Sequence, residues 1–467
     1  MKLVIATALL LVLVPGAGPA WSREAPPAPG IPHDFTLPGK QTVRLENGLS
    51  MTFLEYGTVP MVTLMATVRT GAIDDGGDTW LPDLVMDMLK EGTATRSALD
   101  IARQAADMGG SLGAGAGAEQ ATVGIRVLSE HATGAAALVA DVLRNPAFPA
   151  SELPRLVANY ERNLSVALQE PGSLAGRELS RRVYGDHPLG RTLPEPGQLA
   201  AYTLDDVRRF YAANFGAART HVYVAGRFDR PALEAALRGA FGDWQTGPAP
   251  TVNPPRAATS PQLGFVARPD APQSSLRMAV AAPDLTHADY FPFTVTNTLL
   301  GGSFLSRIMA NIREDKGYAY SPYSSLSAYR RAGLWVMSAD VTTEHTADAL
   351  REIYGEIDRL RAAPPPEAEL EAIKNYRAGL FVVNNSSPDG LLGQLALMDL
   401  HGLPDEYLTQ WVRHVYAVTP AQVSEMVGRW IDPSKMTVVV VGDLDKVRKE
   451  VEALPQLVGA RELETDR

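Results

Sequence analysis

The feature of this chain that most constrains its fold is an internal duplication. In the first half, TLDDVRRFYAANF leads into THVYVAGRFD, and in the second half, TPAQVSEMVGRWI leads into MTVVVVGDLD. A period this long is far greater than that of any solenoid repeat, so we expect two similar domains in tandem. The residues that match at a single offset of 216 are Thr203 with Thr419, Val207 with Val423, Gly226 with Gly442, and Tyr160 with Tyr376.

A proline-rich segment separates the two halves. Residues 246–262, TGPAPTVNPPRAATSPQ, contain five prolines, a density that disfavours both helix and central strand. We therefore expect an extended linker at 246–262. It would join an N-terminal domain at 37–245 to a C-terminal domain at 263–458, with a tail at 459–467.

Each half mixes the hydrophobic periods of strands and helices. Residues 62–68 and 121–127 alternate as half-buried strands do. Between them, SALDIARQAADMGG has Ser97 as a helix N-cap, Asp100 at the third helical position and a glycine stop at Gly109. The regular strand–helix alternation of a parallel sheet is missing. We expect the α+β class, with two homologous domains that each form an antiparallel sheet with packed helices.

The N-terminus has the layout of a secretory signal peptide. Lys2 precedes a short apolar core, and Ala20 and Ser22 follow with the spacing of a cleavage site. The core is shorter than the roughly 20 residues that span a bilayer, although a membrane anchor or a buried N-terminal helix is the alternative. We expect a signal peptide at 1–22, an extension at 23–36, no transmembrane anchor after cleavage, and a periplasmic or otherwise exported protein.

Composition excludes several classes of function. The chain contains no cysteine, which excludes disulfides, thiol catalysis, cysteine-bound zinc and lipid attachment through cysteine. The formal net charge is −10, and no run of five basic residues occurs. Because phosphate binding needs a positive surface, we expect no nucleic-acid partner.

The histidines form no recognisable metal motif. No two of them lie three, four or five residues apart, so no helix presents the paired imidazoles of a zinc site. A zinc site assembled from distant positions, or a Ser–His–Asp triad, stays open at this point. The eight histidines are His33, His131, His187, His221, His287, His345, His401 and His414.

Two segments carry residues of chemical interest. LPDLVMDMLKEGT at 81–93 has the apolar spacing of a helix and places Asp83 and Asp87 one turn apart. Like charges at this spacing repel by a few tenths of a kcal/mol. In the second half, GGSFLSRIMANIREDKGYAYSPYSS places Arg313 near a helix end and Tyr320 on the following strand. Both could donate to a peptide carbonyl, or Arg313 could simply suit the helix dipole.

These segments carry a family resemblance. The chain resembles the insulinase/pitrilysin family of zinc peptidases, on the branch near mitochondrial processing peptidase. The similar segments run through almost the whole mature chain. They are LENGLSMTFLE near the start, LKEGT, YGDHPLGR, and the LLGGSF…IREDKGYAYS block. The resemblance implies that the two domains form a clamshell.

The resemblance also implies that the zinc motif is lost. Active members place an inverted H-x-x-E-H helix just before the segment that matches LKEGT. Here Asp83 and Asp87 replace the two histidine ligands, and Met86 replaces the general-base glutamate. The further ligand falls near 162–164, where no carboxylate stands, and Glu161 is out of register. We therefore expect neither a metal nor a cofactor in this chain; calcium between the two aspartates is an alternative with too few oxygen ligands.

By contrast, the family's Arg/Tyr pair is present. In active members an arginine and a tyrosine seven residues apart hold the substrate backbone near the zinc, and Arg313 and Tyr320 match that spacing, unlike Tyr318 and Tyr323. The resemblance implies a non-zinc subunit that supplies this pair to a homologous partner. The partner would bear H-x-x-E-H and the zinc, and together the two would hydrolyse peptide substrates. The partner would be another gene product in a heterodimer or a second copy of this chain; the alternative function is an inactive structural or peptide-binding member.

Overall fold

The computed structural model of the protein describes residues 33–462. The predicted signal peptide at 1–22, most of the predicted extension at 23–36 and the end of the predicted tail lie outside the described residues. From Asp34 onward the chain forms one compact unit. Within the described part, no helix has both the length and the apolar character needed to cross a membrane.

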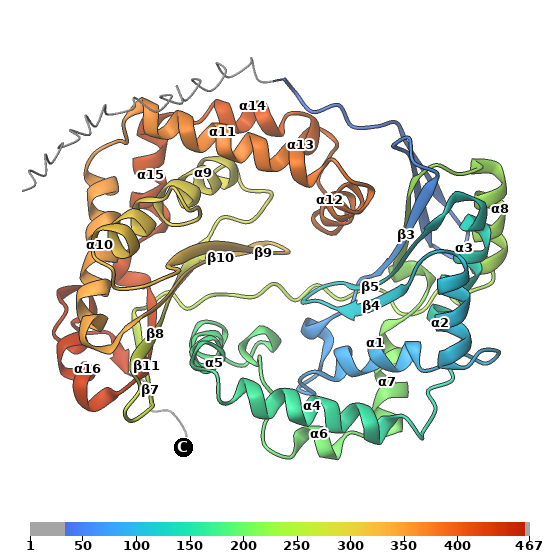
Figure 1. The fold of residues 1–467 in the computed structure, drawn as a ribbon, viewed down its shortest axis with the longest axis horizontal. Coiled ribbons are helices and arrows are strands. Elements are labelled where there is room, and N and C mark those ends of the chain that lie inside the picture. The colour runs from blue at the N-terminus through green and yellow to red at the C-terminus, as the bar shows by residue number, and fades with distance from the viewer. Residues whose placement is uncertain (1–32, 463–467) are drawn as a thin grey trace, which may run out of the picture. The chain divides into compact units, whose positions relative to one another are not determined.

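The first half forms a six-stranded sheet in the order β1-β2-β6-β3-β5-β4 (Figure 1). The β3 strand pairs with β5 and β6 in antiparallel register, whereas β2 and β6 run in parallel. The strands are β1 (Lys40–Arg44), β2 (Ser50–Glu55), β3 (Met61–Val68), β4 (Leu112–Ala116), β5 (Ala121–Leu128) and β6 (Thr220–Gly226).

The second half repeats this topology in the order β12-β7-β11-β8-β10-β9. Five strands correspond one to one, and only the edge strand differs, since β1 comes first in its half and β12 comes last. The strands are β7 (Gln262–Ala267), β8 (Gln273–Ala282), β9 (Tyr323–Tyr329), β10 (Ala332–Thr342), β11 (Thr437–Gly442) and β12 (Arg461–Glu462). The prediction of two homologous α+β halves is therefore confirmed.

The expectation of purely antiparallel sheets needs one correction. In each half the last long strand joins the sheet in parallel with the strand near its start, as β6 does with β2 and β11 does with β7. A parallel pair needs a long crossover connection, and all the helices between these strands supply it. The other pairs of long strands within each sheet are antiparallel.

Helices surround both sheets, and the helix start predicted at Ser97 is confirmed. Ser97, Thr203 and Thr419 each form a capping box with the third residue of the helix they begin. The first half contains α1 (Leu81–Lys90), α2 (Ala98–Asp107), α3 (Ala132–Arg144), α4 (Leu153–Ala167), α5 (Pro171–Tyr184), α6 (Gln198–Ala201), α7 (Leu204–Asn214) and α8 (Arg230–Phe241). The second contains α9 (Tyr290–Leu300), α10 (Thr346–Ala362), α11 (Glu367–Asn384), α12 (Pro388–His401), α13 (Glu406–Thr409), α14 (Trp411–Tyr416), α15 (Pro420–Trp430) and α16 (Leu444–Glu452).

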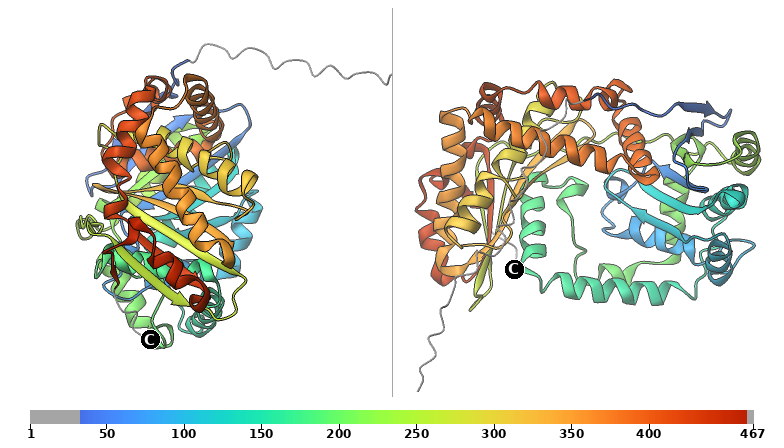
Figure 2. Two further views of the ribbon diagram at one scale, coloured as in Figure 1. Left: turned by 90° about the vertical axis from the view of Figure 1, so that its left-hand side faces the viewer. Right: turned by 45° about the horizontal axis from the view of Figure 1, so that its top comes forward.

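One helix of each half crosses to the sheet of the other half. The α5 helix of the first half packs on β8 and β11, and the α12 helix of the second half packs on β3 and β6 (Figures 1 and 2). Leu179 and Val183 of α5 are buried against Val439 and Val441 in one shared apolar cluster. The halves therefore bury apolar surface reciprocally. The chain between them, residues 245–261, contains no helix or strand, and the predicted linker at 246–262 overlaps it up to the first residue of β7.

Candidate functional site

The acidic pair lies on α1, where the two aspartates have different surroundings. The carboxylate of Asp87 accepts a hydrogen bond from the Tyr160 hydroxyl at 2.7 Å and forms an ion pair with Lys90 at 2.8 Å. Tyr160 comes from α4, so this contact also joins two helices. The hydrogen bond and the cation offset the repulsion that two like charges on one helix would otherwise cause.

Asp83 has no cation partner among the described residues. Its carboxyl is half-buried and lines a cavity of about 440 Å³. Burial raises the pKa of Asp83 to about 6, the negative charge of Asp87 adds to that rise, and only a hydrogen bond from its own backbone opposes it. The carboxyl is therefore ionised at neutral pH, and among the described residues no cation offsets the cost of burying its charge.

We expect Asp83→Asn to stabilise the protein at pH 7.5 and to change little at pH 4. Between the ordinary pKa of 3.8 and about 6 the folded state binds more protons than the unfolded chain, so stability falls as pH rises through this window. After allowance for solvent screening, the gain at pH 7.5 is about 1–2 kcal/mol. Urea unfolding at both pH values measures it. Asp87→Ala is the control of opposite sign, because it removes the acceptor of Tyr160; equal effects at both pH values would contradict the prediction.

The residues that the family resemblance aligns with H-x-x-E-H have side chains that suit zinc poorly. Met86 is 1% exposed, and a thioether cannot take a proton from a metal-bound water. Asp87 is already engaged by Tyr160 and Lys90, and Glu161 is exposed on α4. Within residues 33–462, no group of three or more histidine, aspartate or glutamate side chains is arranged to hold a metal ion.

Arg313 and Tyr320 come together in the second half. Arg313 lies on a π-helical turn, η5 (Met309–Asp315), and its guanidinium carbon lies 4.6 Å from the ring centre of Tyr320 and 4.9 Å from that of Phe304. It also forms an ion pair with Glu314 at 3.1 Å. Tyr320 is 77% exposed. The pair is thus pre-arranged by stacking, with the Tyr320 side chain open to a ligand.

The neighbouring tyrosines are placed differently. Tyr318 stacks on the imidazole of His345, with ring centres 4.2 Å apart. Tyr323 begins β9 and is exposed. Among the described residues, Arg313 has a ring contact with Tyr320 and none with Tyr318 or Tyr323. Within residues 33–462, none of the hydrogen bonds, ion pairs or ring contacts described for Arg313 and Tyr320 joins them to the α1 helix.

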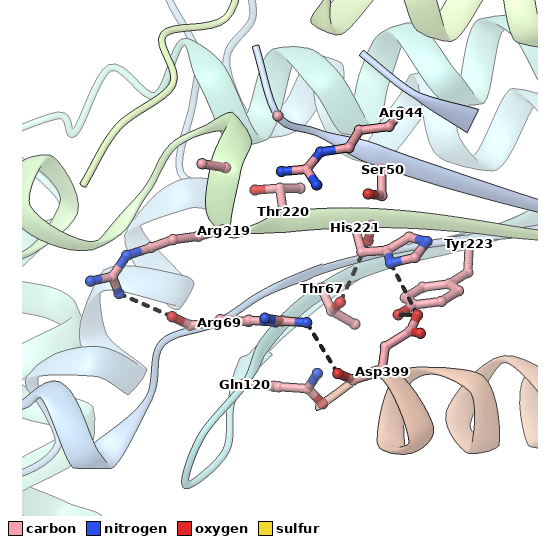
Figure 3. A pocket seen from close by; sticks show the side chains of 12 residues that line it. Arg44, Ser50, Thr67, Arg69, Gln120, Arg219, Thr220, His221, Tyr223 and Asp399 are labelled. Carbon is pink, nitrogen blue, oxygen red and sulfur yellow. Dashed lines mark hydrogen bonds and ion pairs between the residues drawn. The ribbon is translucent and has the colours of Figure 1, made fainter. Parts of the chain in front are cut away.

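A third polar cluster joins the two halves and was missed by the sequence reasoning (Figure 3). His221 on β6 places Nδ1 3.0 Å from the Asp399 carboxylate of α12, which also accepts a hydrogen bond from Tyr223. Arg69 donates to the Asp399 backbone carbonyl at 3.1 Å. Burial would raise the pKa of Asp399, but the hydrogen bonds from His221 and Tyr223 lower it below its ordinary value. These residues border a polar pocket of about 140 Å³.

The cluster has the hydrogen-bond connectivity of a catalytic triad, but its hydroxyl group is not accessible to a substrate. Nε2 of His221 lies 2.7 Å from the Thr52 hydroxyl, but Thr52 is only 3% exposed and shares its hydroxyl with Thr42. A nucleophile needs room for a substrate carbonyl, so we assign this cluster to holding α12 on the first sheet. The one available sequence signal was the HVY alternation, which places His221 and Tyr223 on one face of β6.

Residues 109–113 contain a serine in a pattern that some hydrolases use for a catalytic nucleophile. Gly109, Gly110, Ser111, Leu112 and Gly113 have the pattern G-x-S-x-G. In a nucleophile elbow this pattern ends a strand and begins a helix. Here it follows α2 and leads into β4, so it is a turn from a helix into a strand. The segment is a connection, and Ser111 is not placed as a nucleophile.

Comparison with known proteins finds relatives that align with most of this chain. An uncharacterized zinc protease of Mycobacterium tuberculosis is 26% identical over 449 residues, which cover 94% of this chain and 100% of that protein. An uncharacterized zinc protease of Bacillus subtilis is 24% identical over 372 residues, which cover 78% of this chain and 90% of that protein.

Solved structures share the fold. The peptidase M16 inactive domain from Pseudomonas fluorescens matches with a TM-score of 0.81 and 27% identity, covering 86% of this chain and 98% of that chain. A protease from Helicobacter pylori matches with a TM-score of 0.82 and 15% identity, covering 87% and 100%. Both agree with the predicted clamshell of two α+β halves.

Two family models match consecutive segments. The model described as insulinase (peptidase family M16) matches residues 54–197, and the model described as peptidase M16 inactive domain matches residues 201–376. Together these segments make up more than half of the chain. The chain belongs to peptidase family M16, the insulinase family.

Proposed function

We propose that this chain is the non-zinc subunit of an exported M16 peptidase. A homologous partner with an intact H-x-x-E-H helix would supply the zinc and the general base. Arg313 and Tyr320 of this chain would bind the carbonyl groups of the peptide substrate. The signal-peptide layout of the N-terminus supports a periplasmic or otherwise exported location.

The observation that carries the proposal is the contrast between the two helical sites. The α1 helix lacks zinc ligands and a base, while Arg313 stacks between Phe304 and Tyr320 with the tyrosine side chain exposed. Preorganised donors of this kind stabilise the charge that develops on a carbonyl oxygen. A subunit with no role in substrate binding has no need of such an arrangement.

A second function, peptide binding without catalysis, is favoured by the cavity beside α1. Its walls come from both halves and combine apolar, aromatic and charged side chains, as ligand pockets do. Under this function the chain would hold peptides without a zinc-bearing partner.

Purification of the tagged mature chain from its native host tests the proposal. We expect an M16 homologue with H-x-x-E-H to co-elute in a fixed ratio, and the mixture to cleave peptides in a zinc-dependent manner. Elution of the chain alone or only with itself, together with no gain in activity on adding the candidate homologue, would favour the binding function.

Restoring the motif in this chain should not create a zinc peptidase. The triple variant Asp83→His, Met86→Glu and Asp87→His lacks the third ligand, because Glu161 is exposed and Leu164 is buried at that part of α4. We expect less than one bound zinc per chain by metal analysis after dialysis, and no peptide hydrolysis above background. Chelator-sensitive hydrolysis by the purified variant would contradict this expectation.

A further inference from the structure

The cavity beside α1 lies between elements of both halves. Trp80 and Asp83 border it from the start of α1, Tyr184 from the crossing helix α5, and Tyr329 and Val336 from the second sheet. Its volume of about 440 Å³ falls in the range of about 300–1,000 Å³ that is usual for small-molecule sites. It therefore has room for one amino-acid side chain with its flanking backbone.

The charges that line this cavity leave one carboxylate uncompensated. Arg191 pairs with Asp75 at 2.8 Å, and both border the cavity. Arg277 pairs with Asp340 at 3.6 Å and donates to a backbone carbonyl at 2.8 Å. Asp83 alone has neither a cation nor a side-chain donor among the described residues. With Arg191 and Arg277 each in an ion pair, Asp83 is the charged lining residue for which the described chain offers no partner of opposite sign.

The aromatic side chains of this cavity, like the carboxylate of Asp83, suit a positively charged ligand. Tyr184 and Tyr329 meet edge to face with ring centres 6.2 Å apart, and Trp80 is anchored by a hydrogen bond from its indole to the Thr192 carbonyl at 3.1 Å. Aromatic faces attract organic cations. A buried carboxylate is stabilised by a cation that donates a hydrogen bond to it. A carboxylate in an aromatic cavity is a chemical match for an ammonium or a guanidinium.

We propose that this cavity binds the cationic group of a basic peptide, with Asp83 as its counter-ion and Trp80, Tyr184 and Tyr329 as its aromatic walls. The position that the family uses for a metal ligand would thus hold an organic cation in this chain. The proposal deepens the proposed function and rests on its claim that the chain binds peptides. It needs no partner subunit, because every wall of the cavity belongs to this chain.

Titration calorimetry of the mature chain alone at pH 7.5 tests the proposal with three small amino-acid derivatives. Nα-acetyl-lysine methylamide offers a side-chain ammonium, leucinamide offers only an N-terminal ammonium, and Nα-acetyl-norleucine methylamide offers the lysine shape without charge. We expect one or both cationic probes to bind at a single site and the norleucine probe to bind at least about tenfold more weakly. The better cationic probe identifies a side chain or a peptide N-terminus as the source of the charge.

Two matched variants separate charge recognition from general damage. Asp83→Asn should weaken the cationic probe about tenfold or more, while Asp87→Asn, with the same charge change one turn away, should leave its affinity within about twofold. Tyr329→Leu should weaken the probe without changing the fold seen by circular dichroism. Binding of neither cationic probe, or equal losses in both aspartate variants, would overturn the proposal. Either result would say nothing about the proposed catalytic role of Arg313, because that role is measured only in the two-subunit complex.

Discussion

Replacing Arg313 with alanine is expected to lower kcat/KM of the reconstituted two-subunit peptidase by about 100-fold to 1,000-fold. A preorganised donor to a developing oxyanion contributes about 2.7–4 kcal/mol in other enzymes, and each 1.36 kcal/mol corresponds to about a factor of ten in rate. The guanidinium already contacts the rings of Phe304 and Tyr320, which restricts the orientations it must search. The fall should lie mainly in kcat, because the donor acts most strongly in the transition state.

Three further substitutions, at Tyr320, Tyr323 and Arg313 itself, test whether the loss of activity is specific to the Arg313 guanidinium and its tyrosine neighbour. Tyr320→Phe should also lower kcat, whereas Tyr323→Phe, which alters an exposed tyrosine three residues further along the chain, should change it less than about twofold. Arg313→Lys keeps the charge but loses the planar fork, so it should recover only part of the activity. Size-exclusion chromatography should show unchanged assembly for all variants. Wild-type turnover by the assembled Arg313→Ala complex would refute the role.

Replacing Gly226 with alanine is expected to lower the free energy of unfolding by about 3 kcal/mol or more. Gly226 ends β6 with a φ of +135°, and a Cβ there would lie 2.2 Å from the Met61 carbonyl oxygen and 2.8 Å from the Val62 Cα. Both obstacles are backbone atoms of the paired strand β3, which cannot move without breaking the sheet. Urea unfolding followed by circular dichroism measures the effect.

The matched control is Gly442→Ala at the equivalent position of the repeat. Its φ lies outside the glycine-favouring region, and the nearest obstacle, at 2.6 Å, is the Ser274 side-chain oxygen. We expect a loss of about 1–2 kcal/mol, because a side chain can shift where a backbone cannot. Equal losses for the two variants would show that the positive φ and the β3 backbone are not what makes Gly226 necessary.

The repeat was readable from sequence because its signals are local. Ser97 predicts a helix start through Asp100 three positions away, and the two residues form a capping box. The alternation at 121–127 predicts a strand, which is β5. The family resemblance singled out Arg313 and Tyr320, and in the structure the guanidinium carbon lies 4.6 Å from the ring centre of Tyr320. Their role in a partner's reaction came from the family resemblance and remains a proposal.

What the tertiary structure alone decided depends on residues far apart in the chain. No local pattern indicates that α5 and α12 exchange sheets, since both helices have apolar faces that either sheet could bury. His221 contacts Asp399, which lies more than 170 residues further along the chain. The two residues meet because α12 packs on the sheet of the first half. Asp83 and Asp87 look equivalent in sequence. In the structure, α4 brings Tyr160 to Asp87, whereas α5 and the second sheet enclose a cavity beside Asp83. Sequence determined the elements and their duplication, because caps and alternation act over a few residues. The site was decided by packing between halves, because burial and charge pairing exist only once distant segments meet.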